Sequence, residues 1–183
     1  MNKAQQKAYA KFERLSKTKI SKTLSKDCEA ESLMIDIKRG RLILNSFYEA
    51  ITPETCPQCH GGCCRNPESY WEEKDILYLT LQNSLSKVPE PAAKLTDKCG
   101  WLTEIGCTLR RELRPLTCIE YDCHKIISEA AKQLGVDPEI MWQMVDEVKR
   151  NLNIKYNDLL HRNYILLIEE REEQAMNHAR EML

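Results

Sequence analysis

The sequence has few of the features that all-β proteins and membrane proteins need. Only 6 Gly and 2 Phe occur among 183 residues, which is lean for a fold built from strands and tight turns. The longest apolar runs are a few residues, as at 165–168, whereas a membrane-spanning helix needs roughly 20. No apolar segment or small-residue cleavage site follows the basic N-terminal residues. We therefore expect a cytoplasmic protein with no membrane segment.

The charge is nearly balanced, which argues against binding of nucleic acid through the overall field. The formal net charge is −1, and non-specific nucleic-acid binding needs a basic surface. The first 26 residues are nevertheless basic, with Lys3, Lys7, Lys11, Arg14, Lys17, Lys19, Lys22 and Lys26 against Glu13. The C-terminal stretch is acidic, with Glu169, Glu170, Glu172, Glu173 and Glu181. We interpret both as solvated helical faces; the alternative is a basic arm for an acidic partner or RNA.

The residues before position 53 predict helices. Apolar residues at helical spacing are Ala4, Ala8, Phe12 and Leu15. A polar break follows at 16–21, and a second helix is expected to stop at Gly40. A third short helix over 43–51 should end before Pro53, because the residue before a proline disfavours helical geometry.

The residues after position 124 also predict helices. Asp137, Pro138 and Glu139 supply an N-cap, a proline at the first helical position and an acid in the first turn. An apolar stripe of Ile140, Met141, Met144, Val145 and Val148 follows, and 156–168 predicts another long helix. We interpret the Met and aromatic positions here as packing residues.

Regular structure should be short between 53 and 124. Ser69 and Glu72 have the spacing of a capping box and predict a helix over 70–86. One side of that helix would carry Trp71, Ile76, Leu79 and Asn83. Residues 100–109 predict a small hairpin with Gly106 in the turn, and Pro115 can open a further helix.

The expected fold is therefore mostly α. A small, irregular, Cys-rich metal-binding core with a short hairpin is flanked by N- and C-terminal helices. In this division 1–52 is an N-terminal helical extension, 53–124 is the Cys-rich module, and 125–183 forms C-terminal helices that pack on it.

Cysteine is the residue type whose pattern is most specific. Of 9 cysteines, eight lie in two groups of four, namely Cys56, Cys59, Cys63 and Cys64, and then Cys99, Cys107, Cys118 and Cys123. In a reducing compartment, clustered thiols more often bind metal or do redox chemistry than form disulfides. The C-x-x-C spacing of the first group lets two thiolates reach one ion, and Gly61 and Gly62 free the backbone to curl around it. We predict that all eight are metal ligands.

The adjacent pair Cys63 and Cys64 favours more than one metal atom. Side chains on Cα atoms about 3.8 Å apart diverge, so sharing one tetrahedral ion is awkward. The alternative is that one of the two is a small buried apolar residue. Eight thiolates suit an iron–sulfur cluster, of the 4Fe–4S type for example, or Zn²⁺. The sequence leaves this choice open.

Several further residues are candidates for secondary roles. Cys28 stands alone in a helical pattern and is expected to be a packing residue. His60 and His124, next to cysteines, could replace a thiolate ligand or hydrogen-bond to sulfur. His161 and His178 are expected on the surface.

Arg110, Arg111 and Arg114 lie between two predicted ligands. Their charges would offset that of a polythiolate centre, or they form ordinary surface ion pairs. The Cys56–Cys59 pair also has redox-motif spacing, but such motifs need a βαβ setting that the sequence does not predict. No Gly-rich phosphate-binding loop is present.

The spacing resembles that of the YkgJ-type cysteine-cluster family of zinc- or iron-chelating proteins. The matching positions are Cys56, Cys59, Cys63, Cys64, Cys99, Cys107, Arg114, Pro115 and Cys118, with Cys123 where a closing cysteine is often found. The resemblance covers about 53–124 and implies a metal-chelating module. Thr108 and Leu109 depart from it, because the family usually has an aromatic there. Some larger members join this module to flagellin lysine methylation, but the chain has no recognisable methyl-donor site.

Three functions are compatible with this pattern. The first is a metal-binding protein with an iron–sulfur or zinc centre, acting in redox chemistry or metal handling. The second is a metal-dependent or redox enzyme that uses the centre in catalysis, although no residue is assigned as catalytic. The third is a metal-pinned helical scaffold whose terminal helices bind a protein partner or form a homodimer. Nucleic acid and membranes are not expected partners.

Overall fold

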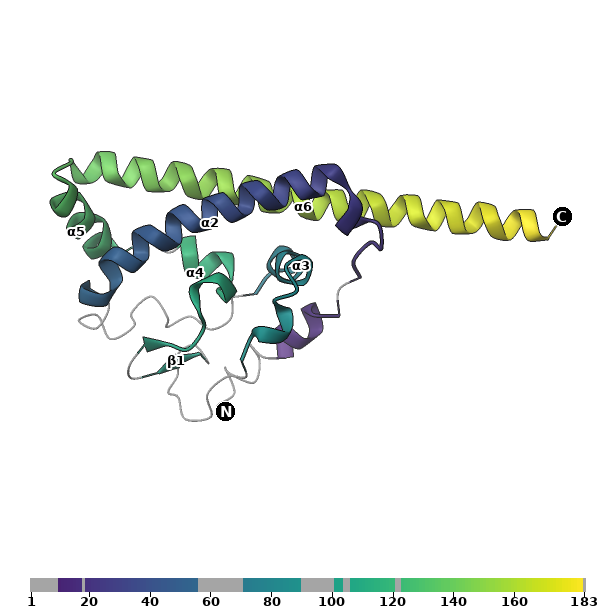
Figure 1. Ribbon diagram of the computed structural model, residues 1–183, viewed down its shortest axis with the longest axis horizontal. Helices are drawn as coiled ribbons and strands as arrows, with labels where there is room; N and C mark the ends of the chain where they lie inside the picture. Colours follow the sequence, from purple (N-terminus) through teal and green to yellow (C-terminus); the bar gives the residue numbers. More distant parts are fainter. Residues whose placement is uncertain are drawn as a thin grey trace.

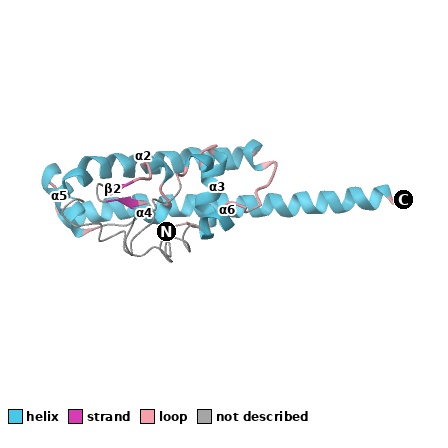
Figure 2. Ribbon diagram, turned by 90° about the horizontal axis from the view of Figure 1, so that it is seen from below, coloured by secondary structure: helices cyan, strands magenta, loops and turns pink. Residues whose placement is uncertain are grey.

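The computed structural model describes residues 10–17, 19–55, 71–89, 101–103, 106–120 and 123–182, with only the backbone described at 53–55, 102, 103 and 106. Within these ranges the fold is mostly helical, as predicted. Two long helices lie side by side along one edge of the molecule, and the shorter elements gather on one side of them (Figure 1). Seen from below, the two long helices again run side by side, and one of them extends past the other elements (Figure 2).

The first long helix, α2, spans Cys28–Thr55 without interruption. The expected stop at Gly40, the separate helix over 43–51 and the end before Pro53 are therefore wrong. Gly40 serves a different purpose: a Cβ there would lie 3.1 Å from Leu152 Cδ1. The glycine lets the neighbouring helix approach closely, and this tertiary contact outweighs its weak helix propensity.

The second long helix, α6, spans Pro138–Glu181 as one element, where the sequence predicted two. Its start is as expected, because the Asp137 carboxylate accepts a hydrogen bond from the Glu139 amide at 2.8 Å. Only part of the predicted stripe is core: Met141 and Val145 are buried, whereas Ile140 and Met144 are exposed. Residues 171–182 are all exposed, and this arm projects past the rest of the chain (Figure 1).

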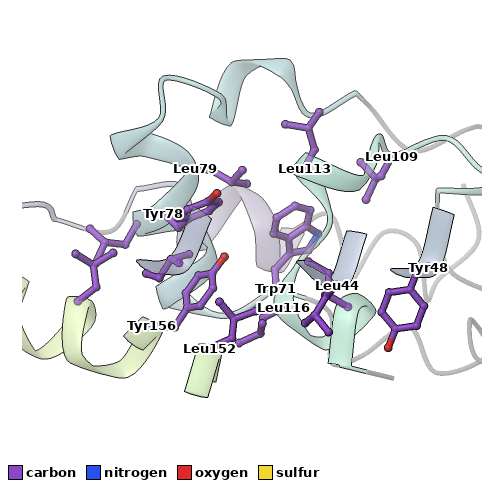
Figure 3. Close-up of a cluster of buried hydrophobic side chains, with 14 of the residues drawn as sticks. Leu44, Tyr48, Trp71, Tyr78, Leu79, Leu109, Leu113, Leu116, Leu152 and Tyr156 are labelled. Carbon is purple, nitrogen blue, oxygen red and sulfur yellow. The ribbon is translucent and has the colours of Figure 1, made fainter. Parts of the chain in front are cut away.

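The shorter elements include three helices and several single turns. The helices are α3 (Glu73–Leu81), α4 (Leu116–Glu120) and α5 (His124–Leu134), and the 3₁₀ turns are η1 (Leu24–Lys26), η5 (Leu85–Lys87) and η6 (Arg111–Leu113). Residues 10–15 are also helical. The core between this layer and the long helices is centred on Trp71, Tyr156, Leu44, Leu113 and Leu116, each about 1% exposed or less (Figure 3).

The predicted helix over 70–86 is shorter than expected, because α3 begins at Glu73. Trp71, Ile76 and Leu79 are buried, as the spacing predicted. The capping pair differs: the Glu72 amide donates to Asp75 Oδ2 at 3.0 Å, whereas the predicted partner Ser69 lies outside the described residues.

Asn83, expected to lie along the side of this helix, instead follows its end, with a left-handed φ of 52°. Two short strands follow, β1 (Leu102–Thr103) and β2 (Gly106–Cys107). They pair antiparallel, Leu102 with Cys107 and Thr103 with Gly106. Gly106 is thus a strand residue and was wrongly expected in the turn.

Candidate metal centre

Three of the eight predicted ligands fall on described elements. Cys107 lies on β2, Cys118 on α4, and Cys123 directly before α5. All three are partly buried and pack against the hydrophobic core. The other five, Cys56, Cys59, Cys63, Cys64 and Cys99, lie outside the described residues.

Cys107 is held next to a fully buried tryptophan. The Thr108 amide and hydroxyl both donate to the Trp101 carbonyl, at 2.7 and 3.0 Å. Trp101 is 0% exposed, and its indole nitrogen donates to the Pro89 carbonyl at 2.8 Å. The residue after Cys107 is therefore hydrogen-bonded to the backbone of a core residue.

Cys118 lies on a helix of only five residues, which begins after Pro115 as predicted. Its amide donates to the Pro115 carbonyl at 3.0 Å. A helix this short gains little from its own hydrogen bonds, so its position depends on contacts with neighbours. Leu116 and Ile119 of this helix are buried in the core. Two buried charged side chains, Arg41 from α2 and Asp75 from α3, bind the backbone that leads into it.

Arg41 is 3% exposed and points its guanidinium at the turn before α4. Nη2 donates to three backbone carbonyls, those of Arg111 at 3.2 Å, Glu112 at 3.2 Å and Arg114 at 2.8 Å. Nη1 donates to the Tyr156 hydroxyl at 2.7 Å. The guanidinium carbon also lies 5.0 Å from the centre of the Tyr78 ring, a favourable cation–π geometry.

Asp75 binds the same segment from α3. It is 2% exposed, and its Oδ1 accepts a hydrogen bond from the Leu116 amide at 2.8 Å. Burial raises the pKa of Asp75 from its usual 3.8 to about 6, against the opposing effects of its two backbone hydrogen bonds and the charge of Arg41. The carboxylate thus caps the start of α4 in a low-dielectric setting.

Cys123 occupies the N-cap position of α5. Its carbonyl accepts from the amides of Ile126 and Ile127 at 2.9 and 3.2 Å, and its side chain makes no capping hydrogen bond. Just upstream, Lys149 donates to the Glu120 carbonyl at 2.7 Å and so ties the end of α4 to α6.

The histidine candidates have different surroundings. His124, the first residue of α5, stacks on Trp142 with ring centres 5.2 Å apart. His60 lies outside the described residues. His161 and His178 are exposed, as predicted.

The arginines between the predicted ligands form ordinary contacts. Arg110 pairs with Glu112 at 3.1 Å and Arg111 with Glu49 at 3.7 Å. Arg114 donates to the Leu109 carbonyl at 3.1 Å. These contacts favour the surface ion-pair interpretation for Arg110, whereas the Arg111 side chain is 16% exposed and also donates to Thr52 Oγ1. The expectation for Cys28 is wrong, because this residue is exposed at the start of α2.

Within the described ranges, no three His, Cys, Asp or Glu side chains come together in a way that could hold a metal ion. Cys107, Cys118 and Cys123 therefore do not form a site without further ligands. A centre that draws on both groups of cysteines stays a prediction.

Sequence reasoning missed Arg41, Asp75 and Lys149, which hold the cysteine-bearing segments. A signal for Arg41 was available, because it shares a helical face with Ile37, Leu44 and Tyr48. A charged residue in register with three apolar ones indicates a buried polar contact.

A shallow surface hollow of about 410 Å³ lies away from these residues. Its lining is Phe12, Ser16, Thr80, Asn83, Leu85 and Ser86. None of these side chains is an acid or base of the kind that general acid–base catalysis uses. The hollow therefore gives no support to an enzyme.

No helix in the described part of the chain is both long and apolar enough to cross a membrane. Comparison with protein-family models, curated proteins and solved structures gives no match.

Proposed function

We propose that the protein binds metal through Cys56, Cys59, Cys63, Cys64, Cys99, Cys107, Cys118 and Cys123, as an iron–sulfur or zinc centre within a small Cys-rich core. The observation that carries the proposal is the spacing of eight thiols within 68 residues, from 56 to 123. Thiolates are the preferred ligands of both zinc and iron–sulfur clusters.

Three features of the described part support it. Cys107, Cys118 and Cys123 are partly buried, as ligands of a shielded ion would be. Cys107 and Cys123 are free thiols, which is what a metal ligand in a reducing cytoplasm requires. The backbone near each of the three is fixed by hydrogen bonds to buried groups, and a rigid support of this kind favours metal binding.

Elemental analysis and a visible spectrum of protein purified without oxygen test the proposal. Iron with acid-labile sulfide and a brown colour would identify a cluster, and colourless protein with about two equivalents of zinc would identify paired zinc sites. Wild-type protein that retains neither metal and takes up neither from solution would contradict the proposal.

Cysteine variants sharpen the test. Cys59→Ser and Cys63→Ser should lower metal content and thermal stability together, because the binding free energy of such a site is also folding free energy. Cys28→Ser is the matched control, since Cys28 is exposed at the start of α2. Equal metal content in all three variants would show that the first cysteine group is not part of the centre.

A second candidate function is a metal-pinned scaffold for a protein partner. The exposed arm of α6, residues 171–182, favours it, because this length of helix packs on no described element. Sedimentation equilibrium of the full chain and of a chain ending at Arg171 tests for self-association. If each of the two proteins has the mass of its own monomer, a homodimer through the arm is excluded.

A further inference from the structure

The turn that precedes α4 is gripped by two buried charges from two different helices. Arg41 of α2 binds the carbonyls of Arg111, Glu112 and Arg114. Asp75 of α3 binds the amide of Leu116. Acceptors and a donor within six consecutive residues are thus bound by side chains from two different helices.

Buried charges of this kind are a costly way to gain stability alone. Well-packed apolar residues of similar volume often stabilise a core as much as a buried ionic pair does. Charged side chains add geometric specificity, because the N–H groups of a planar guanidinium point in fixed directions. The carbonyls that bind it must lie in matching positions. The contacts of Arg41 and Asp75 therefore select a single backbone path for 111–116.

That path ends at a predicted ligand. Pro115 and Leu116 are buried, and the Cys118 amide bonds back to the Pro115 carbonyl at 3.0 Å. Cys118 follows the last clamped residue, Leu116, by two positions, less than one helical turn. Any displacement of the clamped turn would therefore move the thiol of Cys118 with it.

We propose that Arg41 and Asp75 are positioning residues for Cys118, which hold the turn 111–116 so that this thiol is already in place when metal binds. The inference rests on the proposed metal-binding function. It assigns a role to two residues that lie outside the cysteine motif and that belong to helices remote from it in the sequence.

The contact of Arg41 with the turn is supported by a further buried residue, Tyr156. The Tyr156 hydroxyl accepts from Arg41, and burial raises the pKa of Tyr156 far above its usual value, so the phenol stays neutral. Arg41 therefore binds a neutral oxygen on this side, while its charge interacts with the carboxylate of Asp75.

The test compares Arg41→Met with Arg39→Met in the full chain. Arg39 lies on the same helix but is exposed, so it is a matched control. Two measurements are made on each protein: Zn²⁺ affinity by competition with a chelator, and amide hydrogen exchange of 111–118 in the metal-free state. Global unfolding free energy is measured in parallel.

We expect Arg41→Met to lower Zn²⁺ affinity by about 10–100-fold, the usual effect of removing an outer-shell partner of a metal ligand. Exchange of 111–118 should become faster while exchange of α6 does not, whereas Arg39→Met should match wild type in both. Arg41→Lys keeps the charge but loses the planar fork. Its Zn²⁺ affinity and its exchange rates should therefore fall between those of Arg41→Met and Arg39→Met. Arg41→Lys replaces Arg41→Met in the test if Arg41→Met does not fold. Asp75→Asn, which retains a single acceptor oxygen, can be used in the same way.

Faster local exchange with Zn²⁺ affinity within about twofold of the Arg39→Met control would overturn the positioning role, because about 10–100-fold is expected. The proposed function would survive that result. Wild-type protein that binds no metal would instead remove the proposed function and the positioning role together. The two failures are therefore distinguishable from the wild-type measurement.

Discussion

The long helices make two kinds of interface, and the chemistry of the two differs. Where α2 packs on α6 at Gly40, the contact is apolar and close, with Leu152 against the glycine. Where the long helices meet irregular backbone, the buried residues are polar, as with Arg41 and Lys149. A helix satisfies its own backbone, whereas a turn brings unpaired carbonyls and amides that need partners when they are buried.

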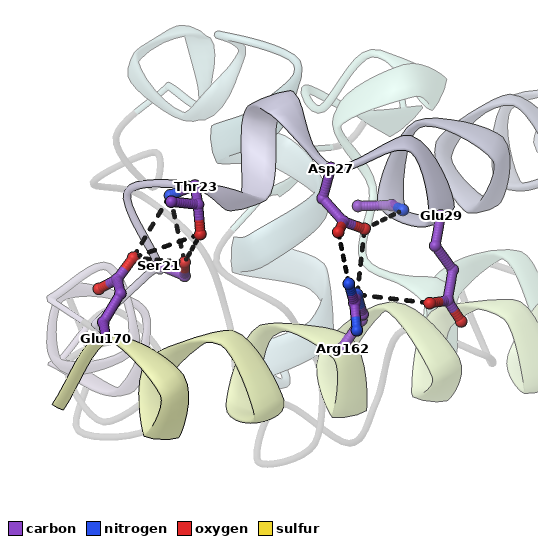
Figure 4. A network of polar contacts seen from close by, with 7 residues as sticks. Ser21, Thr23, Asp27, Glu29, Arg162 and Glu170 are labelled. Atoms are coloured by element: carbon purple, nitrogen blue, oxygen red, sulfur yellow. Dashed lines mark hydrogen bonds and ion pairs between the residues drawn. The ribbon is translucent and has the colours of Figure 1, made fainter. Parts of the chain in front are cut away.

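The N-terminal segment also brings irregular backbone against α6, where polar side chains in the second half of the helix bind it. Asn163 is fully buried, and its carbonyl oxygen accepts from the Ser21 amide at 2.9 Å. Two helical turns further along α6, Glu170 accepts from the Ser21 hydroxyl at 2.6 Å and the Lys22 amide at 2.7 Å (Figure 4). Polar side chains on α6 thus receive irregular backbone at two separate places.

The largest effect is expected from breaking the apolar interface. Leu152→Ala should lower the free energy of unfolding by about 3 kcal/mol, from lost burial and the cavity left beside Gly40. Ile154→Ala is the control, because Ile154 is 55% exposed, and it should cost less than about 1 kcal/mol. Urea denaturation of both variants checks this, and similar midpoints would show that the interface is not tightly packed.

A pH effect of comparable size is expected at the polar interface. Because burial raises the pKa of Asp75 from 3.8 to about 6, the native state binds the proton more tightly than the unfolded chain. The stability from this group is therefore fully present below pH 4 and declines as pH rises to 6, by up to about 3 kcal/mol.

Unfolding free energies of wild type and Asp75→Asn between pH 4 and 7 measure this effect. The difference between the two should change across pH 4–6 and be flat above. Asp27 acts in another window: the hydrogen bond from Arg162 lowers its pKa to about 2, so its contribution is lost as pH falls below 4. A flat difference throughout would show that Asp75 is not desolvated.

A smaller loss is expected from removing one helix-to-turn contact. Lys149→Met leaves the Glu120 carbonyl without its donor and should cost about 1–3 kcal/mol. Arg150→Met is the control, because the Arg150 side chain is 70% exposed and pairs with Asp146 one turn away. Such a pair is worth less than about 0.5 kcal/mol. Equal thermal midpoints of the two variants would show that the contact of Lys149 with the Glu120 carbonyl does not stabilise the protein.

The smallest effect is expected from the arm. Ending the chain at Arg171 removes 172–183, of which the described residues, 172–182, are all exposed. It should change the unfolding free energy by less than about 0.5 kcal/mol. Glu170→Gln, which weakens the contacts to Ser21 and Lys22, should cost more although it changes one side chain. Calorimetry of the two proteins checks the order.

Local signals in the sequence predicted structure well where they acted alone. Asp137 and Pro138 start α6 as expected, because a cap depends on neighbours within three residues. The interpretation of Gly40 failed because its role is set by Leu152, 112 positions away. The spacing of the cysteines is visible in the sequence, and their role as metal ligands stays a prediction. Arg41 and Asp75 act on a turn some 70 and 40 positions along the chain. A local pattern can indicate that Arg41 is buried, but not which turn it contacts.

The length of α6 has a practical consequence for work on the purified protein. Its 44 residues extend about 66 Å at 1.5 Å per residue, and the distal turns stand clear of the body (Figure 1). A particle with such a spike diffuses more slowly than a sphere of the same mass. Size-exclusion columns calibrated with globular standards will therefore report too large a mass, and light scattering or sedimentation equilibrium is needed to count chains.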